Sequence, residues 1–275
     1  MPSTITSWGR YPKVDAREVF FESQDDLAAL IEQGTQFIPR GNARSYGDSS
    51  LNDIVATSTR RKKIIDFDTK SGIIKCESGL LFSEILDFIV PKGWFLPVTP
   101  GTKFITVGGA IASDVHGKNH HKDGSFSNHM LDFELLCADG KIRTCSKTQN
   151  ADIFSATCGG MGLTGIILEA RFQTIKIESA FIKQLQVKAE NLDEILDLFE
   201  KYEGLPYTMA WIDCLKSGRY YGRSILIAGD HAKKSDLSAK QETKLLKPTG
   251  KGNITMPFNL PSFTLNTWSI KAFNA

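Results

Sequence analysis

Three glycine-rich segments, at residues 39–48, 100–119 and 158–166, place the strongest constraint on how this chain can fold. Glycine adopts backbone angles that other residues avoid, and it lets a ligand approach the main chain closely. The first segment can therefore present successive N–H groups to a diphosphate, although an ordinary turn would have the same composition. The second leaves room for a flat or extended ligand or for close helix packing, and Thr106 is expected to cap a short helix facing an anion.

Residues 160–165 spell G-x-G-x-x-G, the pattern of a dinucleotide-binding loop. That fingerprint has to follow a strand and open a helix. Here the sequence predicts a helix before it, at 151–157, and a strand after it, at 165–177. The order is reversed, so the pattern excludes a Rossmann fold.

The composition limits the classes of protein to which the chain can belong. Its 275 residues correspond to about two domains, and 41% hydrophobic with 23% charged residues is ordinary for a globular protein. A net charge of +2 argues against a nucleic-acid-binding protein. No run of roughly 18 apolar residues occurs, and the N-terminus is polar, so we expect a cytoplasmic protein without a transmembrane segment.

Five widely spaced cysteines, without a C-x-x-C pair, argue against a disulfide framework or a zinc ribbon. Most have apolar neighbours, which predicts small buried thiols. The histidines cluster at His116, His120, His121 and His129, and the first two have i, i+4 spacing. Gly117 lies between those two and no carboxylate–histidine motif accompanies them, so we expect no metal. His116 is expected to serve a ligand pocket, and the other histidines to cap, hydrogen-bond or face solvent.

Up to about residue 178 the pattern predicts short strands and helices in alternation. Ser23 is expected to cap the first helix, which Gly34 ends, and Ser83 to cap the second. Asp139-Gly140 predicts a hairpin turn. The expected helices cover residues 23–34, 82–90 and 151–157, and the expected strands cover 36–39, 64–67, 73–76, 130–137, 141–145 and 165–177.

A second domain is expected from residue 179, which gives domains at 1–178 and 179–275. Residues 231–255 are poor in apolar side chains and predict a mobile loop. The chain ends on an apolar stretch without a polar tail, which indicates the N-terminal part of a longer domain. The predicted elements are a strand at 181–187, a helix that Asn191 caps and Gly204 ends, and strands at 207–213 and 224–228.

Taken in order, four motifs resemble the FAD-binding domain of the vanillyl-alcohol-oxidase type, also called the PCMH type. They are the R-G-x-x-x-S loop at residues 40–45, Glu77-Ser78-Gly79, Pro100-Gly101 with Val107-Gly108-Gly109, and the stretch from Cys158 to Ile166. The resemblance covers residues 18–177. It implies an α+β fold, in which a two-subdomain FAD-binding domain is followed by the start of an α+β substrate, or cap, domain.

A narrower likeness extends over nearly the whole chain. Residues 43–48, 114–121 and 124–129, with Trp8-Gly9-Arg10 and residues 209–213, are similar to a subgroup that oxidises a polyprenyl-linked sugar. This likeness implies oxidation of a secondary sugar hydroxyl to a ketone, with hydride transfer to flavin N5 and loss of the proton to a base. A small-molecule or lipid-linked sugar substrate, an NAD(P)-dependent reductase partner and a peripheral association with the membrane follow from the likeness alone.

The same resemblance assigns roles to residues. Many relatives carry a histidine in the first loop that bonds to the flavin, whereas the loop here reads through Tyr46 without one, so noncovalent FAD is expected. His116, Lys118 and Tyr46 are expected to face the substrate side of the flavin as catalytic residues, and Trp211 to contact substrate from the second domain. The expected cofactor contacts are Arg40, Gly41, Asn42, Ala43, Arg44, Ser45, Tyr46, Gly47, Pro100, Gly101, Thr102, Val107, Gly108, Gly109, Ala110, Ser113, His116, Gly117, Gly160, Gly162, Gly165 and Ile166.

Two alternatives stay open. One is a sugar-lactone or 2-hydroxy-acid oxidase on the same fold. The other is a truncated FAD-binding module without catalytic activity, because the chain ends before the lysine and cysteine that the subgroup places on its substrate face.

Overall fold

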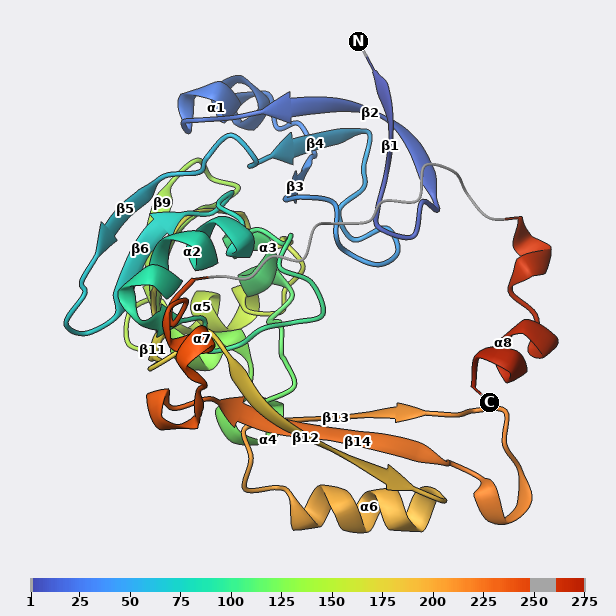
Figure 1. The fold of residues 1–275 in the computed structure, drawn as a ribbon. Helices are drawn as coiled ribbons and strands as arrows, with labels where there is room; N and C mark the ends of the chain where they lie inside the picture. Colours follow the sequence, from blue (N-terminus) through green and yellow to red (C-terminus); the bar gives the residue numbers. More distant parts are fainter. Residues whose placement is uncertain (1, 248–260, 275) are drawn as a thin grey trace. The chain divides into compact units, whose positions relative to one another are not determined.

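The structure is a computed structural model that describes residues 2–247 and 261–274 (Figure 1). The chain divides into two compact units, Met1–Ile177 and Glu178–Ala275, and each combines helices with sheets. The fold is therefore α+β, as the sequence predicts. The assignment of the second unit as a substrate domain stays a prediction.

The N-terminal part of the first unit is a four-stranded sheet in the order β1-β2-β4-β3. β1 pairs with β2 antiparallel, whereas β4 runs parallel to both β2 and β3. One helix, α1, connects β2 to β3. These elements are β1 (Ser3–Thr6), β2 (Lys13–Phe20), α1 (Asp25–Glu32), β3 (Ile38–Arg40) and β4 (Ile54–Thr57).

The rest of the first unit is built on a five-stranded antiparallel sheet in the order β5-β6-β10-β8-β9. Its core holds a line of phenylalanines, in which the ring of Phe126 lies 5.3 Å from Phe82 and 5.0 Å from Phe172. The elements are β5 (Ile64–Phe67), β6 (Ile73–Glu77), α2 (Phe82–Ile89), η1 (Val90–Lys92), β7 (Trp94–Phe95), α3 (Val107–Ala112), α4 (His120–Asp123), η2 (Phe126–His129), β8 (Met130–Leu136), β9 (Ile142–Ser146), α5 (Ala151–Thr157), β10 (Ile166–Gln173) and β11 (Ile175–Lys176).

The first two helices begin differently from the prediction. At α1, the Asp26 carboxylate accepts a hydrogen bond of 2.9 Å from the N–H of Ser23, which is not the N-cap. At α2, Leu81 is the N-cap and the Glu84 carboxylate accepts from its N–H at 2.8 Å, while Ser83 lies inside the helix. In both helices a first-turn carboxylate therefore accepts from an N–H at or before the N-cap, and no serine hydroxyl caps the helix.

The strand predicted at 165–177 is broken into β10 and β11, and β11 pairs with β7 instead of continuing the larger sheet. Thr174, between them, donates from its N–H and its hydroxyl to the carbonyl of Gly72, at 3.0 and 2.5 Å. The break is therefore a tertiary effect of the β5–β6 turn. The order of α5 before and β10 after the G-x-G-x-x-G stretch is as predicted.

The start of β10, a strand of the larger sheet, also packs its side chains against the smaller sheet. Ile166 and Leu168 lie in a core cluster with Phe21 from the end of β2, Leu27 from α1 and Ala56 from β4. Leu168 is nevertheless part of the strand at the centre of the larger sheet. This shared segment fixes the loop that enters β10 against the smaller sheet.

The second unit is a three-stranded antiparallel sheet in the order β12-β14-β13, with α6 on one face (Figure 1). Ile195 and Leu198 of α6 pack against Leu226 and Ala228 of β14. Asn191 caps α6 as predicted, because its side chain accepts from the N–H of Glu194 at 3.0 Å. The elements are β12 (Ile182–Ala189), α6 (Leu192–Lys201), β13 (Tyr207–Ile212), η3 (Gly218–Tyr220), β14 (Ser224–His231), η4 (Lys234–Asp236), α7 (Ala239–Glu242), η5 (Ser262–Thr264) and α8 (Thr267–Phe273).

The loop predicted at 231–255 is in part regular structure. It contains η4 and α7, and Asp236 accepts hydrogen bonds from the N–H of Lys233 at 3.1 Å and from Lys183 Nζ at 2.6 Å. Local capping by polar side chains stabilises these turns without the apolar residues on which the prediction relied. Residues 248–255 of that prediction lie outside the described residues.

All five cysteines are free thiols. Cys76 and Cys145 are buried, Cys137 and Cys158 are partly buried and Cys214 is exposed, so the prediction that most are buried thiols holds fully for only two of them. Cys214 lies two residues after β13, at the surface of the second unit.

Arg61 is a buried cation between the two sheets of the first unit. It donates to the backbone carbonyls of Glu22 and Leu168. Its guanidinium also lies 3.5 Å from the Glu77 carboxylate and 3.8 Å from that of Glu169. One side chain therefore ties the end of β2, β6 and β10 together.

We predict that Arg61→Ala lowers the free energy of unfolding by about 3–5 kcal/mol, because it leaves the buried Glu77 carboxylate without a counter-charge. Urea denaturation of the variant and the parent measures this difference. Arg143→Ala is the control, since it removes an exposed ion pair with Asp139 and should leave the stability nearly unchanged. Equal losses in the two variants would contradict the role given to Arg61.

Candidate functional site

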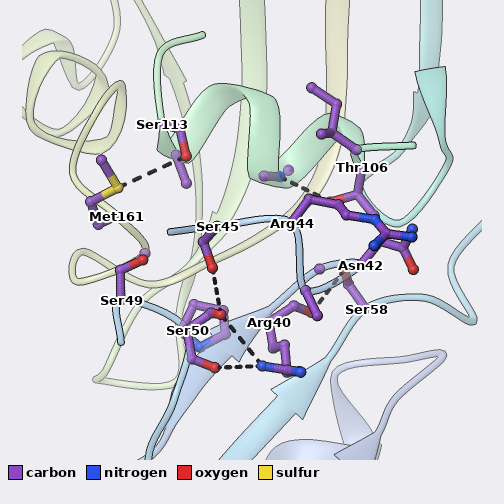
Figure 2. Close-up of a pocket in the computed structure, with 18 of the residues that line it drawn as sticks. Arg40, Asn42, Arg44, Ser45, Ser49, Ser50, Ser58, Thr106, Ser113 and Met161 are labelled. Carbon is purple, nitrogen blue, oxygen red and sulfur yellow. Dashed lines mark hydrogen bonds between the residues drawn. The ribbon is translucent and has the colours of Figure 1, made fainter. Parts of the chain in front are cut away.

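The first unit contains a cavity of about 540 Å³, within the range of small-molecule sites (Figure 2). Its walls are the loop after β3, the segment that leads into and forms α3, and the loop that enters β10. Of the residues predicted to hold a cofactor, it brings together Arg40, Gly41, Asn42, Ala43, Arg44, Ser45, Tyr46, Pro100, Gly101, Thr102, Gly108, Gly109, Ser113, Gly162, Gly165 and Ile166.

Arg40 holds the first wall in place. Its guanidinium donates to the Thr6 carbonyl at 2.7 Å and to the Ser50 carbonyl at 3.1 Å, and it lies 4.0 Å from the Glu18 carboxylate. Burial lowers the pKa of Arg40, and Glu18 opposes that shift. Figure 2 shows the contact with Ser50 behind the loop. The Arg40 side chain therefore braces the loop, rather than offering a free cation to a ligand.

The loop at residues 42–47 keeps its N–H groups unpaired. Its own side chains and carbonyls fix it: Asn42 donates to the Phe104 carbonyl at 2.8 Å, and the Ser45 carbonyl accepts from the N–H of Trp8 at 3.1 Å. Ala43 has φ 52, a left-handed angle that turns successive N–H groups toward a common side. Among the described residues, none accepts a hydrogen bond from the N–H groups of 42–47. They stay available to an anion.

Two exposed groups flank this loop. Arg44 is exposed and forms no ion pair within residues 2–247 and 261–274. Tyr46 lines the cavity, is 79% exposed, and its ring meets that of Trp8 edge to face at 5.6 Å. This part of the cavity is open, and it carries a cation and two aromatic rings.

The second wall depends on close backbone packing. Thr106 caps α3 as predicted, since its hydroxyl accepts from the N–H of Gly109 at 3.1 Å. A Cβ at Gly41 would lie 2.3 Å from that hydroxyl, so no larger residue fits there. The N–H of Gly108 donates to the Ser78 carbonyl at 2.8 Å and joins α3 to the end of β6. The glycines thus bring three segments together around one cavity.

The loop into β10 forms the third wall. The N–H of Met161 donates to the Ala112 carbonyl at 2.8 Å, and the Ser113 hydroxyl lies 3.8 Å from the Met161 sulfur (Figure 2). A Cβ at Gly162 would lie 2.7 Å from Pro39. Burial, assisted by a nearby carboxylate, raises the pKa of Cys158 to about 12, so this thiol is protonated at neutral pH.

Several residues predicted as cofactor contacts do not line the cavity. Val107 and Ala110 are buried in the core. Gly117 and Gly160 pack against backbone, because an added Cβ would lie 2.7 Å from the Thr99 carbonyl and 2.1 Å from the Ala156 carbonyl. Gly47 also lies outside the lining. The small size of Gly117 and Gly160 has a packing reason in this structure, whereas Gly47 has open space around it and a φ of 63. Contact of these residues with a cofactor stays a prediction.

His116 and Lys118 are exposed and follow Val115, which lines the cavity. Two contacts hold this segment in place. The Asp114 carboxylate accepts a hydrogen bond from the Ser127 N–H at 2.8 Å. The backbone of His116 forms an isolated antiparallel β-bridge with that of Ser125. The ring of His116 lies 4.9 Å from that of His120, edge to face. Their catalytic role stays a prediction. The described part of the chain contains no group of three or more metal-ligating side chains.

Trp211 lies in the second unit, on β13. Ala210 packs toward α6, and side chains alternate along a strand, so Trp211 lies on the opposite face of the sheet. It pairs with Ile225 across the sheet and is 36% exposed. An apolar, accessible face of this kind is compatible with substrate contact, which stays a prediction.

The cavity also contains residues that the sequence analysis did not assign to it. Ser58 arrives at the end of β4, and no local pattern predicts that position. Ser78 belongs to the Glu77-Ser78-Gly79 motif, and Trp8 to another quoted motif, but neither was given a role. The lining residues outside the three glycine-rich segments are Trp8, Ser49, Ser50, Ser58, Ser78 and Ile167, whereas Pro39, Ile105, Thr106, Ala112, Val115 and Met161 lie within those segments.

Comparison with known proteins identifies the kind of domain that contains this cavity. Residues 16–146 match the FAD binding domain family. The first unit therefore contains an FAD-binding domain of the PCMH type. The chain is 34% identical to decaprenylphosphoryl-beta-D-ribose oxidase of Mycolicibacterium smegmatis, over 96% of this chain and 60% of that enzyme.

Other relatives match smaller parts of the chain. L-gulonolactone oxidase of Mus musculus is 25% identical over 67% of this chain and 43% of its own length. D-lactate dehydrogenase of Anaerostipes hadrus is 27% identical over 57% of this chain and 33% of its own. The chain thus spans less than two thirds of each of these relatives. In the described part, no helix has the length and apolar character needed to cross a bilayer.

The residues present fit FAD. Unpaired N–H groups at 42–47 and the cation of Arg44 suit a diphosphate. Gly101 and Gly109 leave the backbone open on the cavity side. One buried hydroxyl of the lining, that of Ser78, has no partner among the described residues. FAD is the cofactor of this domain.

We predict that Gly109→Val loses bound FAD. An added Cβ would meet only Thr106 Oγ1, at 3.0 Å, so the rest of the valine side chain would occupy the cavity. The measurement is the visible absorbance of flavin per protein after purification, with circular dichroism to verify folding. Gly204→Val is the matched control, because a Cβ there meets no atom within 4 Å and lies outside the lining. Full flavin content in Gly109→Val would refute this placement.

Proposed function

We propose that the protein is an FAD-dependent oxidoreductase that oxidises a secondary hydroxyl of a sugar, most closely a polyprenyl-phosphate-linked ribose. The observation that supports this substrate is the extent of similarity. The decaprenylphosphoryl-beta-D-ribose oxidase matches 96% of the chain, whereas the lactone oxidase matches 67% and the lactate dehydrogenase 57%. A match over 96% of the chain extends into the second unit, where a substrate domain is predicted.

We assign the open part of the cavity to the diphosphate and flavin ring. The N–H groups of 42–47 and the guanidinium of Arg44 would hold the diphosphate, and the backbone of Gly101 and Gly109 would pack against the cofactor. Bound FAD supplies the acceptor for the hydride that leaves the alcohol carbon. The loop at 40–47 contains neither histidine nor cysteine to bond to a flavin, which supports noncovalent binding.

Tyr46, His116 and Lys118 are proposed to act on the substrate. Tyr46 is exposed at the cavity, where its hydroxyl can hydrogen-bond to a sugar. No described residue hydrogen-bonds to the ring nitrogens of His116, so a neutral imidazole nitrogen is free to accept the proton of a substrate hydroxyl. The Lys118 ammonium would attract an anionic substrate group such as phosphate. Trp211 would contribute apolar contact from the second unit.

Two further proposals rest on the relatives. A ketone product is the substrate class of an NAD(P)-dependent reductase, which we propose as a partner that completes an epimerisation. The second candidate function is a sugar-lactone or 2-hydroxy-acid oxidase, which the matches to L-gulonolactone oxidase and D-lactate dehydrogenase favour.

The substrate proposal is tested by anaerobic reduction of the bound flavin in the full-length protein. The reduction is measured as the bleaching of the visible flavin absorbance. We expect a polyprenylphosphoryl ribose to reduce the flavin, and L-gulonolactone and D-lactate not to. Reduction by either of the last two alone would establish the second candidate. Bound FAD that none of the three reduces would favour the module without activity.

We predict that His116→Ala retains FAD. Its flavin should be reduced about 100-fold more slowly by whichever of the three substrates reduces the parental protein, because a proton acceptor is lost. Stopped-flow absorbance measures the rate, and flavin content measures retention. His121→Ala, an exposed histidine of α4, is the control and should reduce at the parental rate. Parental kinetics in His116→Ala would remove this residue from the site.

A further inference from the structure

Ser78 stands out among the residues around the cavity because its hydroxyl is buried and unpartnered. The residue is 1% exposed, and no described residue hydrogen-bonds to its Oγ. A buried hydroxyl without a partner is unfavourable, so such groups in proteins usually have a ligand or water to complete them. Ser78 also lines the cavity, which places the unpaired hydroxyl where a ligand can reach it.

The position of this hydroxyl is tightly fixed. The Ser78 N–H donates to the Leu168 carbonyl at 2.9 Å, and its own carbonyl accepts from the Gly108 N–H at 2.8 Å. The backbone is therefore held by β10 on one side and by α3 on the other. A Cβ at Gly108 would lie 3.1 Å from Ser78 Cβ, so the side chain faces the first turn of α3, where Gly108 also lines the cavity.

The surroundings of Ser78 favour an uncharged group. The two nearby cations are already engaged, Arg40 with the Thr6 and Ser50 carbonyls and Arg61 with two carbonyls and two carboxylates. The neighbouring wall is apolar, because Ser78 bonds to β10 beside Ile167, which also lines the cavity. A neutral hydroxyl beside an apolar wall suits a sugar hydroxyl or ring heteroatom, and not a diphosphate.

The depth of Ser78 in the cavity indicates which part of FAD its hydroxyl contacts. The flavin ring has to meet a substrate, so it belongs at the open part of the cavity, where Tyr46 is 79% and Trp8 59% exposed. Ser78 and Ser58 are 1% and 8% exposed and mark the enclosed part. We infer that the Ser78 hydroxyl hydrogen-bonds the adenosine half of FAD in the enclosed part of the cavity. The inference rests on the FAD site and does not depend on the substrate.

Titration of the full-length apoprotein with FAD, followed by flavin fluorescence, tests this contact. Ser78→Ala should raise the Kd for FAD about three- to tenfold, the loss expected for one hydrogen bond. The inhibition constant of ADP-ribose, which carries the adenosine half, should rise by the same factor. The inhibition constant of FMN, which lacks that half, should stay at the parental value. Ser83→Ala, a buried serine of α2 outside the lining, is the control and should keep the parental Kd.

The possible results test separately the Ser78 contact, the FAD site and the oxidation of a sugar. An unchanged Kd for FAD in Ser78→Ala, or equal weakening of FMN and ADP-ribose, would overturn the inference. A lower unfolding temperature of the Ser78→Ala apoprotein than of the parental apoprotein would also overturn it, because the hydroxyl would then have a structural partner. Failure of the parental protein to bind FAD would refute the cofactor site itself. Failure of sugar oxidation with FAD binding intact would leave the Ser78 contact standing.

Discussion

Close backbone packing around the start of α3 is the constraint on which the rest of the site depends. Gly41 lies where any Cβ would collide with the Thr106 hydroxyl, and that hydroxyl caps α3. The first turn of α3 bonds to the Ser78 carbonyl through the N–H of Gly108. Three segments far apart in sequence can approach this closely only because their contact points lack side chains. The cavity is the space that remains between them.

The polar groups around the cavity divide into two kinds. Arg40 and Arg61 are buried and fully engaged, and they fix the loop after β3 and the start of β10. The N–H groups of 42–47, the guanidinium of Arg44 and the Ser78 hydroxyl have no partner among the described residues. The first set builds a rigid frame, and the second set remains for a ligand. This division explains how one domain combines a stable core with an extended cofactor site.

Local patterns were sufficient for most elements, whereas the class of site was predicted from the resemblance to a known family. The reversed order around 160–165 and the Thr106 and Asn191 caps were predicted and are confirmed. The broken strand has a tertiary cause, because Thr174 bonds to the β5–β6 turn. The errors at the two helix starts are local, because a first-turn carboxylate accepts from an N–H three residues earlier and no serine hydroxyl caps the helix. Small residues such as Gly117 were predicted as ligand contacts, yet they are explained by packing against backbone.

The sequence by itself determined the order of the elements and of the glycine-rich motifs, because glycine spacing and hydrophobic periodicity are local properties of a chain. The kind of cofactor followed from the resemblance of those ordered motifs to a known family. Only the tertiary structure decided which polar groups are free. Arg40 and Arg44 are both arginines of one loop, but contacts with Thr6, Ser50 and Glu18 engage the first and leave the second exposed. Whether a hydroxyl such as that of Ser78 has a partner depends on segments distant in sequence, so no local pattern reveals it.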